Sequence, residues 1–207
     1  MKQEAATKNA VELVRERIQQ SIEAKQKLLL DVSLQEQVVQ VALRIVESLR
    51  ADGKIFFCGN GGSAADSQHL VAEFTGRFLK ERRALPAIAL SVNTSSLTAI
   101  GNDYGFDLVF ARQIEALGRE GDVVVGISTS GSSPNVVRAI EAAKAKALWT
   151  VALTGASGGK LKDLADCTLR MPSDATPRIQ ECHILTGHLI CEIVEEMMFG
   201  NLAAEAP

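Results

Sequence analysis

The sequence predicts an α/β protein, a three-layer sandwich in which helices flank a mostly parallel sheet of five strands. Two observations favour this fold class. From residue 53 onward, short apolar runs rich in β-branched and aromatic residues alternate with longer helical stretches. Each run is also too short and too continuously apolar for a strand with one solvated face. Strands buried on both faces, as in a parallel sheet, therefore fit better.

The elements are expected in the following order. Apolar residues recur at helical spacing through residues 8–30 and 34–51, which predicts two N-terminal helices. Five strands are then expected at KIFFC (54–58), AIALSV (87–92), DVVVGIS (122–128), TVALTG (150–155) and CTLRM (167–171). The periodic segment RIQECHILTGHLICEIVEEMMFG predicts a last helix that ends at Gly200.

Composition limits the number of domains and the kinds of partner. The 207 residues, 46% of them hydrophobic, are enough for one well-buried domain and cramped for two. The net charge is −3 and basic residues form no stripe, so nucleic acid is not an expected partner. No apolar run approaches the roughly 20 residues that span a bilayer, so a membrane is not expected either.

Cysteine usage points to a reducing compartment. The four cysteines lack C-x-x-C spacing and mostly sit inside apolar runs, which is typical of buried free thiols. The N-terminus has no apolar segment behind a basic one. A cytoplasmic protein is therefore expected.

Two loops are candidates for ligand binding, because ligands of open parallel sheets bind beyond the carboxyl ends of the strands. GNGGSAADS follows the first strand, and its glycines and small residues let backbone N–H groups approach an anion at a helix start. STSGSSPN follows the run DVVVGI and places Ser133 as the N-cap before Pro134. One such loop is more often a plain turn with a helix cap, but two at corresponding strand ends favour a phosphate site.

His69 and Glu73 are the first candidate pair for catalysis or metal binding. If the helix begins near Ser63, their spacing places both side chains on one face, with Cβ atoms about 6 Å apart. An imidazole and a carboxylate so placed suit a divalent metal such as zinc, or an acid/base pair. A solvated surface contact is the commoner outcome for such a pair. Their position beside the expected ligand crevice argues against that outcome here.

The last helix adds Gln180, His183 and His188 as possible partners. Angles around an ideal helix select neither histidine. Gln180 and His188 would lie about 12 Å apart along the axis and could just share a metal, whereas Gln180 and His183 are comfortably close. The residues alone therefore predict a His/Glu/Gln/His cluster and leave open which late histidine belongs to it. Taken alone, a histidine on an apolar helix face is more often a satisfied core residue.

Four motifs carry a family resemblance: GNGGSAADSQHLVAEF, LTAIGNDYGFD, EGDVVVGISTSGSSPN and TPRIQECHILTGHLICEIVE. Together and in this order they resemble the sugar isomerase (SIS) domain, and within it the phosphoheptose isomerase family, over nearly the whole chain. The resemblance implies a single SIS domain over residues 1–207. Residues 1–51 would contribute to oligomer packing, and residues 52–207 would form the α/β core and C-terminal helix. It further implies a cytoplasmic homotetramer with a zinc ion in each subunit.

The resemblance also implies a reaction. The family's aldose–ketose isomerases convert sedoheptulose 7-phosphate to D-glycero-D-manno-heptose 7-phosphate through an enediol. This is the first step of heptose biosynthesis for the lipopolysaccharide core or related surface glycans. The sugar phosphate and the chain itself are then the expected partners.

Position by position, the resemblance implies roles for individual residues. Zinc would be held by His69, Glu73, Gln180 and His188, which selects His188 over His183, and Glu73 and His188 would also act as acid and base. The implied substrate-binding residues are Asn60, Gly61, Gly62, Glu73, Asn102, Asp103, Ser128, Thr129, Ser130, Ser133 and Gln180.

Other members of the fold perform different functions. A non-catalytic SIS adaptor that binds the replication initiator, or a sugar-phosphate-sensing regulator, can keep the fold and loops without the metal cluster. An N-acetylmuramic acid 6-phosphate etherase should also lack the His/Glu/Gln/His set. The adaptor lacks counterparts of Glu73 and His188, and this chain has both. The enzyme is therefore favoured.

Overall fold

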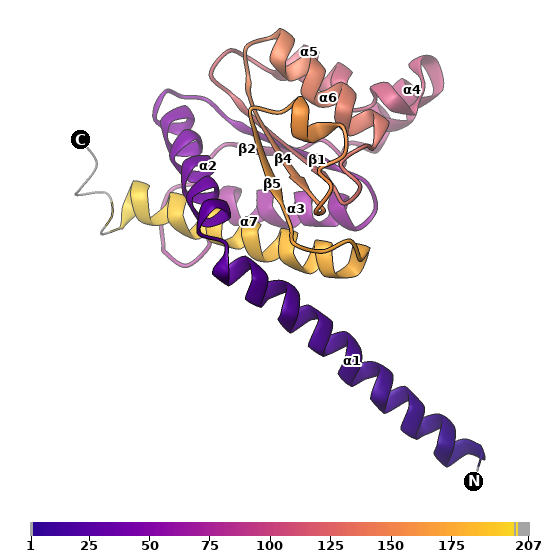
Figure 1. Ribbon diagram of the computed structural model, residues 1–207. Coiled ribbons are helices and arrows are strands. Elements are labelled where there is room, and N and C mark those ends of the chain that lie inside the picture. Colours follow the sequence, from indigo (N-terminus) through magenta and orange to yellow (C-terminus); the bar gives the residue numbers. More distant parts are fainter. Residues whose placement is uncertain (1, 201, 203–207) are drawn as a thin grey trace.

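The computed structural model describes residues 2–200 and 202. A five-stranded sheet lies between two layers of helices, and the N-terminal helix extends away from this body (Figure 1). The strands are β1 (Ile55–Gly59), β2 (Ala87–Ala89), β3 (Val123–Ser128), β4 (Trp149–Thr154) and β5 (Cys167–Arg170). Their order is β2-β1-β3-β4-β5, and every neighbouring pair is parallel. The predicted three-layer α/β fold is confirmed.

Seven α-helices and two 3-10 helices occupy the described residues. The α-helices are α1 (Lys2–Leu30), α2 (Val32–Arg50), α3 (Gly62–Thr75), α4 (Thr94–Tyr104), α5 (Ala111–Leu117), α6 (Pro134–Ala145) and α7 (Thr176–Phe199). The 3-10 helices are η1 (Phe106–Leu108) and η2 (Leu161–Asp163). The last α-helix ends at the C-cap Gly200, as the sequence predicts.

Alternate residues of each strand face opposite helix layers, which explains the continuously apolar runs. Phe57 and Val125 belong to a core cluster that includes residues of α2, α3 and α7. Their neighbours Phe56 and Val124 belong to a second cluster, which includes residues of α5 and α6. Both faces of the sheet are thus covered, so the central strands are mostly apolar along their length.

Some element boundaries differ from those predicted. The second strand ends at Ala89 and not at Val92, because the chain turns there toward Asn93. The Asn93 side chain accepts a hydrogen bond from the Ser96 N–H at 3.0 Å and caps α4. The two N-terminal helices begin earlier than predicted, and Asp31 alone separates them. Its side chain accepts from the Leu34 N–H at 3.0 Å, which caps α2.

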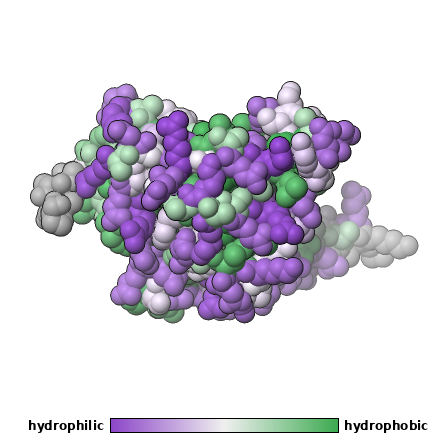
Figure 2. Space-filling model, turned by 90° about the horizontal axis from the view of Figure 1, so that it is seen from above, coloured by the Kyte–Doolittle hydropathy of each residue, from purple (hydrophilic) through white to green (hydrophobic). Residues whose placement is uncertain are grey.

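The remaining general features are as follows. All four cysteines are buried free thiols, as predicted, and burial raises the pKa of Cys58 to about 12. None of the described helices is both long and apolar enough to cross a bilayer. The face drawn in Figure 2 is mostly hydrophilic, with hydrophobic residues in small groups between polar ones.

Candidate active site

The glycine loop after β1 brings α7 against the start of α3. Gly61 adopts a positive φ of 55° and serves as the N-cap residue of α3. A Cβ on Gly62 would lie 2.2 Å from Nε2 of Gln180. A side chain at position 62 would therefore displace this carboxamide from the first turn of α3.

Three predicted site residues meet between α3 and α7. His69 Nε2 lies 2.8 Å from His188 Nε2 and 3.3 Å from Glu73 Oε1. One ligand atom from each of these three residues lies within 4.8 Å of the others. Gly187 permits this approach of the two helices, because a Cβ there would lie 2.6 Å from a methyl carbon of Leu70.

The donor atoms of this cluster fit a divalent metal ion. Two imidazole nitrogens and a carboxylate oxygen form a donor set that zinc accepts. Zinc binds such ligands at about 2.0–2.2 Å, so two atoms that share one ion lie at most about 4.4 Å apart. The His69–His188 and His69–Glu73 separations meet this limit. His69, Glu73 and His188 could therefore hold a metal ion together.

Gln180 belongs to α7, and its carboxamide lies near Asp66 of α3, one turn before His69. Asp66 is buried, and its Oδ2 has no hydrogen-bond partner among the described residues. Burial raises the pKa of Asp66, although Gln180 and His69 lower it in part. Sequence reasoning did not single out Asp66, although its position three residues before His69 predicts a shared helix face.

His183 lies in the core and not in this cluster. It is fully buried, and its Nε2–H donates to the Thr154 carbonyl at 3.1 Å. Nδ1 has no partner among the described residues. Burial lowers the pKa of His183 to about 4, although the bond to Thr154 opposes this change. Of the two late histidines, His188 is the one beside His69.

The loop after β3 gathers three serine hydroxyls at the start of α6. Ser128 Oγ lies 2.9 Å from Ser133 Oγ and 3.4 Å from Ser130 Oγ. Ser133 occupies the predicted N-cap position, but its side chain makes no capping hydrogen bond. The predicted N-cap position is thus confirmed, and the Ser133 hydroxyl pairs with that of Ser128. The first N–H groups of α6 are thus left without a side-chain cap.

The glycine within this serine loop, Gly131, fixes the shape of the loop. Gly131 has a φ of 64°, and a Cβ there would lie 2.1 Å from the Gly158 carbonyl oxygen. The carbonyl of Thr129 accepts from the Gly155 N–H at 3.0 Å. The loop is therefore packed closely against the loop that follows β4.

The two ligand-binding loops are joined by a pair of asparagines. The side chains of Asn60 and Asn135 exchange two hydrogen bonds, each 2.8 Å long. Asn60 belongs to the glycine loop, and Asn135 is buried in the first turn of α6. Sequence reasoning missed Asn135, whose one signal is its place directly after Pro134.

Asn102 and Asp103 belong to α4 and not to these two loops. Both are exposed on α4, and Asn102 Nδ2 donates to Asp103 Oδ1 at 2.8 Å. Within the described part of this chain, no hydrogen bond or ion pair joins them to the serine loop or to the histidines.

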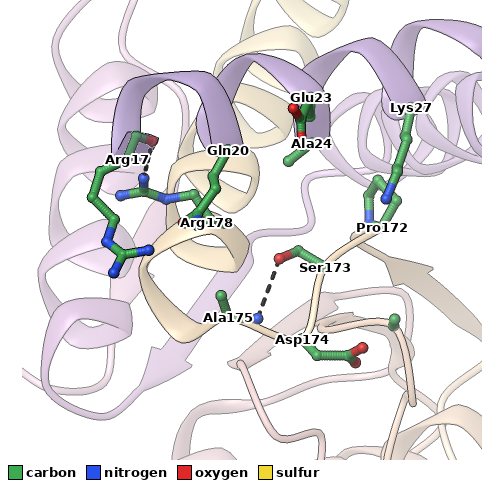
Figure 3. Close-up of a pocket in the computed structure, with 11 residues that line it drawn as sticks. Arg17, Gln20, Glu23, Ala24, Lys27, Pro172, Ser173, Asp174, Ala175 and Arg178 are labelled. Carbon is green, nitrogen blue, oxygen red and sulfur yellow. Dashed lines mark hydrogen bonds between the residues drawn. The ribbon is translucent and has the colours of Figure 1, made fainter. Parts of the chain in front are cut away.

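A pocket of about 650 Å³ between α1 and the start of α7 is a separate feature (Figure 3). Its lining residues carry both signs of charge, with Arg17, Lys27 and Arg178 against Glu23 and Asp174. None of the predicted site residues lines it. The candidate active site is therefore the histidine cluster with its two loops.

The chain resembles known proteins over most of its length. A family model described as "SIS domain" matches residues 5–155. The phosphoheptose isomerase of a Nitratiruptor species is 61% identical over 151 residues, 73% of this chain and 81% of that protein. That of Clostridium acetobutylicum is 50% identical over 188 residues, 91% of this chain and 96% of that protein.

A solved structure agrees with the fold. The phosphoheptose isomerase from Neisseria gonorrhoeae superposes with a TM-score of 0.84 at 49% identity, over 89% of this chain and 98% of that one. By fold and family model, the chain belongs to the SIS domain family. Its identity to these relatives over most of both chains places it, within that family, among the phosphoheptose isomerases.

Proposed function

We propose that this enzyme interconverts sedoheptulose 7-phosphate and D-glycero-D-manno-heptose 7-phosphate through an enediol, with His69, Glu73, Gln180 and His188 as zinc ligands. The observation that supports it best is the convergence of the His69, Glu73 and His188 donor atoms within 4.8 Å. The names of the relatives support a phosphorylated heptose as the substrate. An adaptor or a regulator would have no need of this cluster.

An aldose–ketose exchange moves a proton between two neighbouring carbon atoms, which needs a base and an acid. In the proposed roles, Glu73 removes the proton from the carbon next to the carbonyl group and delivers it to the adjacent carbon. His188 moves the hydroxyl protons. Zinc, when bound, supplies polarisation of the substrate oxygens.

The two loops would hold the rest of the substrate. The hydroxyls of Ser128, Ser130 and Ser133 and the uncapped N–H groups of α6 suit a phosphate group. The further residues proposed to contact the sugar phosphate are Asn60, Gly61, Gly62, Asn102, Asp103, Thr129 and Gln180. The reciprocal Asn60–Asn135 bonds support this role for the residues of the two loops, because they join these loops in one site.

The setting of the enzyme is also proposed. Residues 1–207 would act as one SIS domain in a homotetramer, with the N-terminal helices in the subunit contacts. Four unpaired, buried thiols suit the reducing cytoplasm. The product would supply the lipopolysaccharide core or related surface glycans.

The decisive test is Glu73→Gln. The amide keeps the shape and one oxygen donor but cannot accept a proton from carbon, so we expect folding and substrate binding without turnover. Loss of a general base typically lowers the rate about 10²- to 10⁴-fold. The measurement is exchange of the C1 hydrogen of sedoheptulose 7-phosphate with deuterium from solvent, followed by NMR.

Two controls accompany this test. Zinc per subunit is measured in the wild type, in Glu73→Gln and in His188→Ala, and turnover is repeated with a chelator. We expect His188→Ala to lose zinc and the chelator to abolish turnover. Near-normal exchange in Glu73→Gln would assign the base to another residue, and a zinc-loaded wild type without exchange would favour the adaptor.

A further inference from the structure

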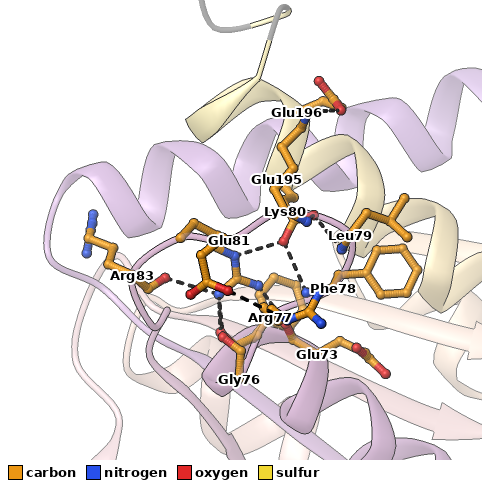
Figure 4. Close-up of polar contacts among 12 residues, drawn as sticks. Glu73, Gly76, Arg77, Phe78, Leu79, Lys80, Glu81, Arg83, Glu195 and Glu196 are labelled. Atoms are coloured by element: carbon orange, nitrogen blue, oxygen red, sulfur yellow. Dashed lines mark hydrogen bonds and ion pairs between the residues drawn. The ribbon is translucent and has the colours of Figure 1, made fainter.

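A buried carboxylate on α7 holds the segment that follows α3. Glu195 is 2% exposed, and its Oε1 accepts from the Phe78 N–H at 3.1 Å and from Arg82 Nε at 2.9 Å. Its Oε2 accepts from the N–H groups of Leu79 at 2.7 Å and Lys80 at 2.8 Å (Figure 4). Three successive backbone amides and one guanidinium thus share a single carboxylate.

The partner guanidinium secures the end of α3. Arg82 Nη2 donates to the Glu73 carbonyl at 2.6 Å, and Nη1 donates to the carbonyls of Phe74 at 2.8 Å and Gly76 at 3.0 Å. Carbonyls at a helix C-terminus lack partners within the helix and attract a cation. Arg82 therefore fixes the backbone of the turn that carries Glu73.

Glu195 remains charged at neutral pH. Burial raises the pKa of this carboxyl group, but the three amides and Arg82 outweigh burial and hold the pKa below its usual value. A buried ion pair of this kind adds little net stability compared with well-packed apolar residues. The Glu195–Arg82 pair is better explained by the geometry that it imposes on the segment after α3.

The segment held in this way also contacts the candidate active site. The Phe78 ring stacks on the His188 ring, with centroids 5.6 Å apart and planes inclined by 28°. His188 and Glu195 are two turns apart on α7 and so lie on one face of that helix. One network therefore connects the backbone of Glu73 with the ring of His188.

We propose that Arg82 and Glu195 are positioning residues for the isomerase reaction. They touch no reacting atom, and they act by holding Glu73 and His188 at the separation that proton transfer requires. This inference rests on the roles proposed above for those two residues. It predicts that loss of the ion pair lowers kcat more than it changes KM.

The test compares Glu195→Gln with a matched control at the opposite end of the strands. Asp122 is a buried carboxylate that accepts from the N–H groups of Lys54 at 2.9 Å and Arg119 at 2.8 Å, and from Lys54 Nζ at 2.7 Å. It directly precedes β3, whereas the candidate site lies beyond the carboxyl ends of the strands. Asp122→Asn likewise replaces a buried carboxylate by an amide, but away from the candidate active site.

We expect both variants to unfold at lower temperature than the wild type. Only Glu195→Gln should lower kcat, by roughly ten- to a hundredfold, with KM nearly unchanged, since misplacement by about 1 Å can cost 10²-fold. A wild-type kcat in Glu195→Gln would overturn the inference, as would an equal loss in Asp122→Asn. A higher KM at constant kcat in Glu195→Gln would also overturn it.

A second variant covers failure of Glu195→Gln to fold. Phe78→Leu removes the ring on His188 and keeps the ion pair, so a lower kcat in this variant supports the inference and a wild-type kcat overturns it. Glu73→Gln in the same assay separates the two proposals. If it is inactive while Glu195→Gln is fully active, only the positioning role fails; if it is fully active, the assignment of Glu73 fails, and the positioning role fails with it.

Discussion

His183 and His188 are five residues apart on one helix but differ in burial and in their polar partners. His188 is partly exposed beside His69, whereas His183 is enclosed and bonded to the Thr154 carbonyl of β4. A carbonyl can only accept, so Nε2 of His183 carries a proton, and a pKa of about 4 keeps the ring neutral near pH 7. Protonation would place a charge on Nδ1, which has no partner among the described residues. His183 therefore links folding to pH.

We expect acid to destabilise the enzyme through His183. Its pKa is about 4 in the fold and ordinarily 6.5, so between these values the unfolded chain binds more protons. Stability therefore falls as the pH falls through this window, by about 2 kcal/mol between pH 7 and pH 5. Urea unfolding at both pH values would measure the loss.

The matched variant is His183→Gln. Its amide can still donate to Thr154 but does not titrate, so the loss between pH 7 and pH 5 should become smaller by that amount. An unchanged pH dependence would show that other groups govern acid stability.

The choice between these histidines marks a limit of sequence reasoning at the residue scale. Helical periodicity correctly put both on the last helix, but it could not tell which faces the core. That depends on how α7 packs, with Gly187 against Leu70 of α3 and His183 under β4. The contact between Gly187 and Leu70 joins segments more than a hundred residues apart, and local sequence pattern does not encode such contacts.

At the scale of elements, the start of α6 combines a helix N-terminus with clustered hydroxyls. Ser133 and Ser130 both approach Ser128, whereas the Ser132 hydroxyl accepts from the Lys160 N–H at 3.2 Å. A phosphate at this helix end would meet the hydroxyls and the uncapped N–H groups together.

We expect Ser130→Ala and Ser133→Ala to weaken substrate binding. A lost hydrogen bond to a charged group costs about 1–2 kcal/mol, which raises KM roughly five- to thirtyfold. The same loss should appear in the inhibition constant of inorganic phosphate. Ser132→Ala is the control and should leave both constants near the wild-type values. A fall in kcat with unchanged phosphate binding would contradict the assignment.

The positions of such loops were predictable, but their side-chain geometry was not. Parallel strands end at one edge, so the glycine and serine loops could be assigned to that edge from the order of the elements. The orientation of the Ser133 hydroxyl toward Ser128 depends on the turn at Gly131, which packs against the loop after β4. Local sequence pattern does not encode this tertiary contact.

At the scale of the whole molecule, the parallel sheet followed from the apolar runs, whereas the network around Glu195 gave no signal in the sequence. Glu195 and Arg82 read as ordinary surface charges, because polarity alone does not reveal burial. The fold buries both side chains where α7 packs against the segment after α3. The five-strand core was thus more predictable than the packing that holds the candidate site.

The N-terminal helix leaves an apolar stripe exposed along its length. In α1, only Ala24 and Leu28 are among the buried core residues of the described chain. Val11, Val14, Ile18 and Ile22 are 44–57% exposed at helical spacing. A helix that extends from its own body (Figure 1) gains little from packing within its chain, and isolated helices are marginal in water. This stripe suits burial against other subunits of the proposed tetramer.

We therefore expect Ile18→Glu to disrupt the assembly. In the single subunit Ile18 is 56% exposed, so the substitution should change the stability of the fold by no more than about 0.5 kcal/mol. At a subunit contact the same carboxylate would be buried without a partner and would oppose association. Asn9→Glu adds the same charge on the opposite face of α1 and is the control. Sedimentation equilibrium should show a tetramer for the wild type and for Asn9→Glu, and smaller species for Ile18→Glu with unchanged circular dichroism. A wild-type mass for Ile18→Glu would remove this stripe from the proposed subunit contacts.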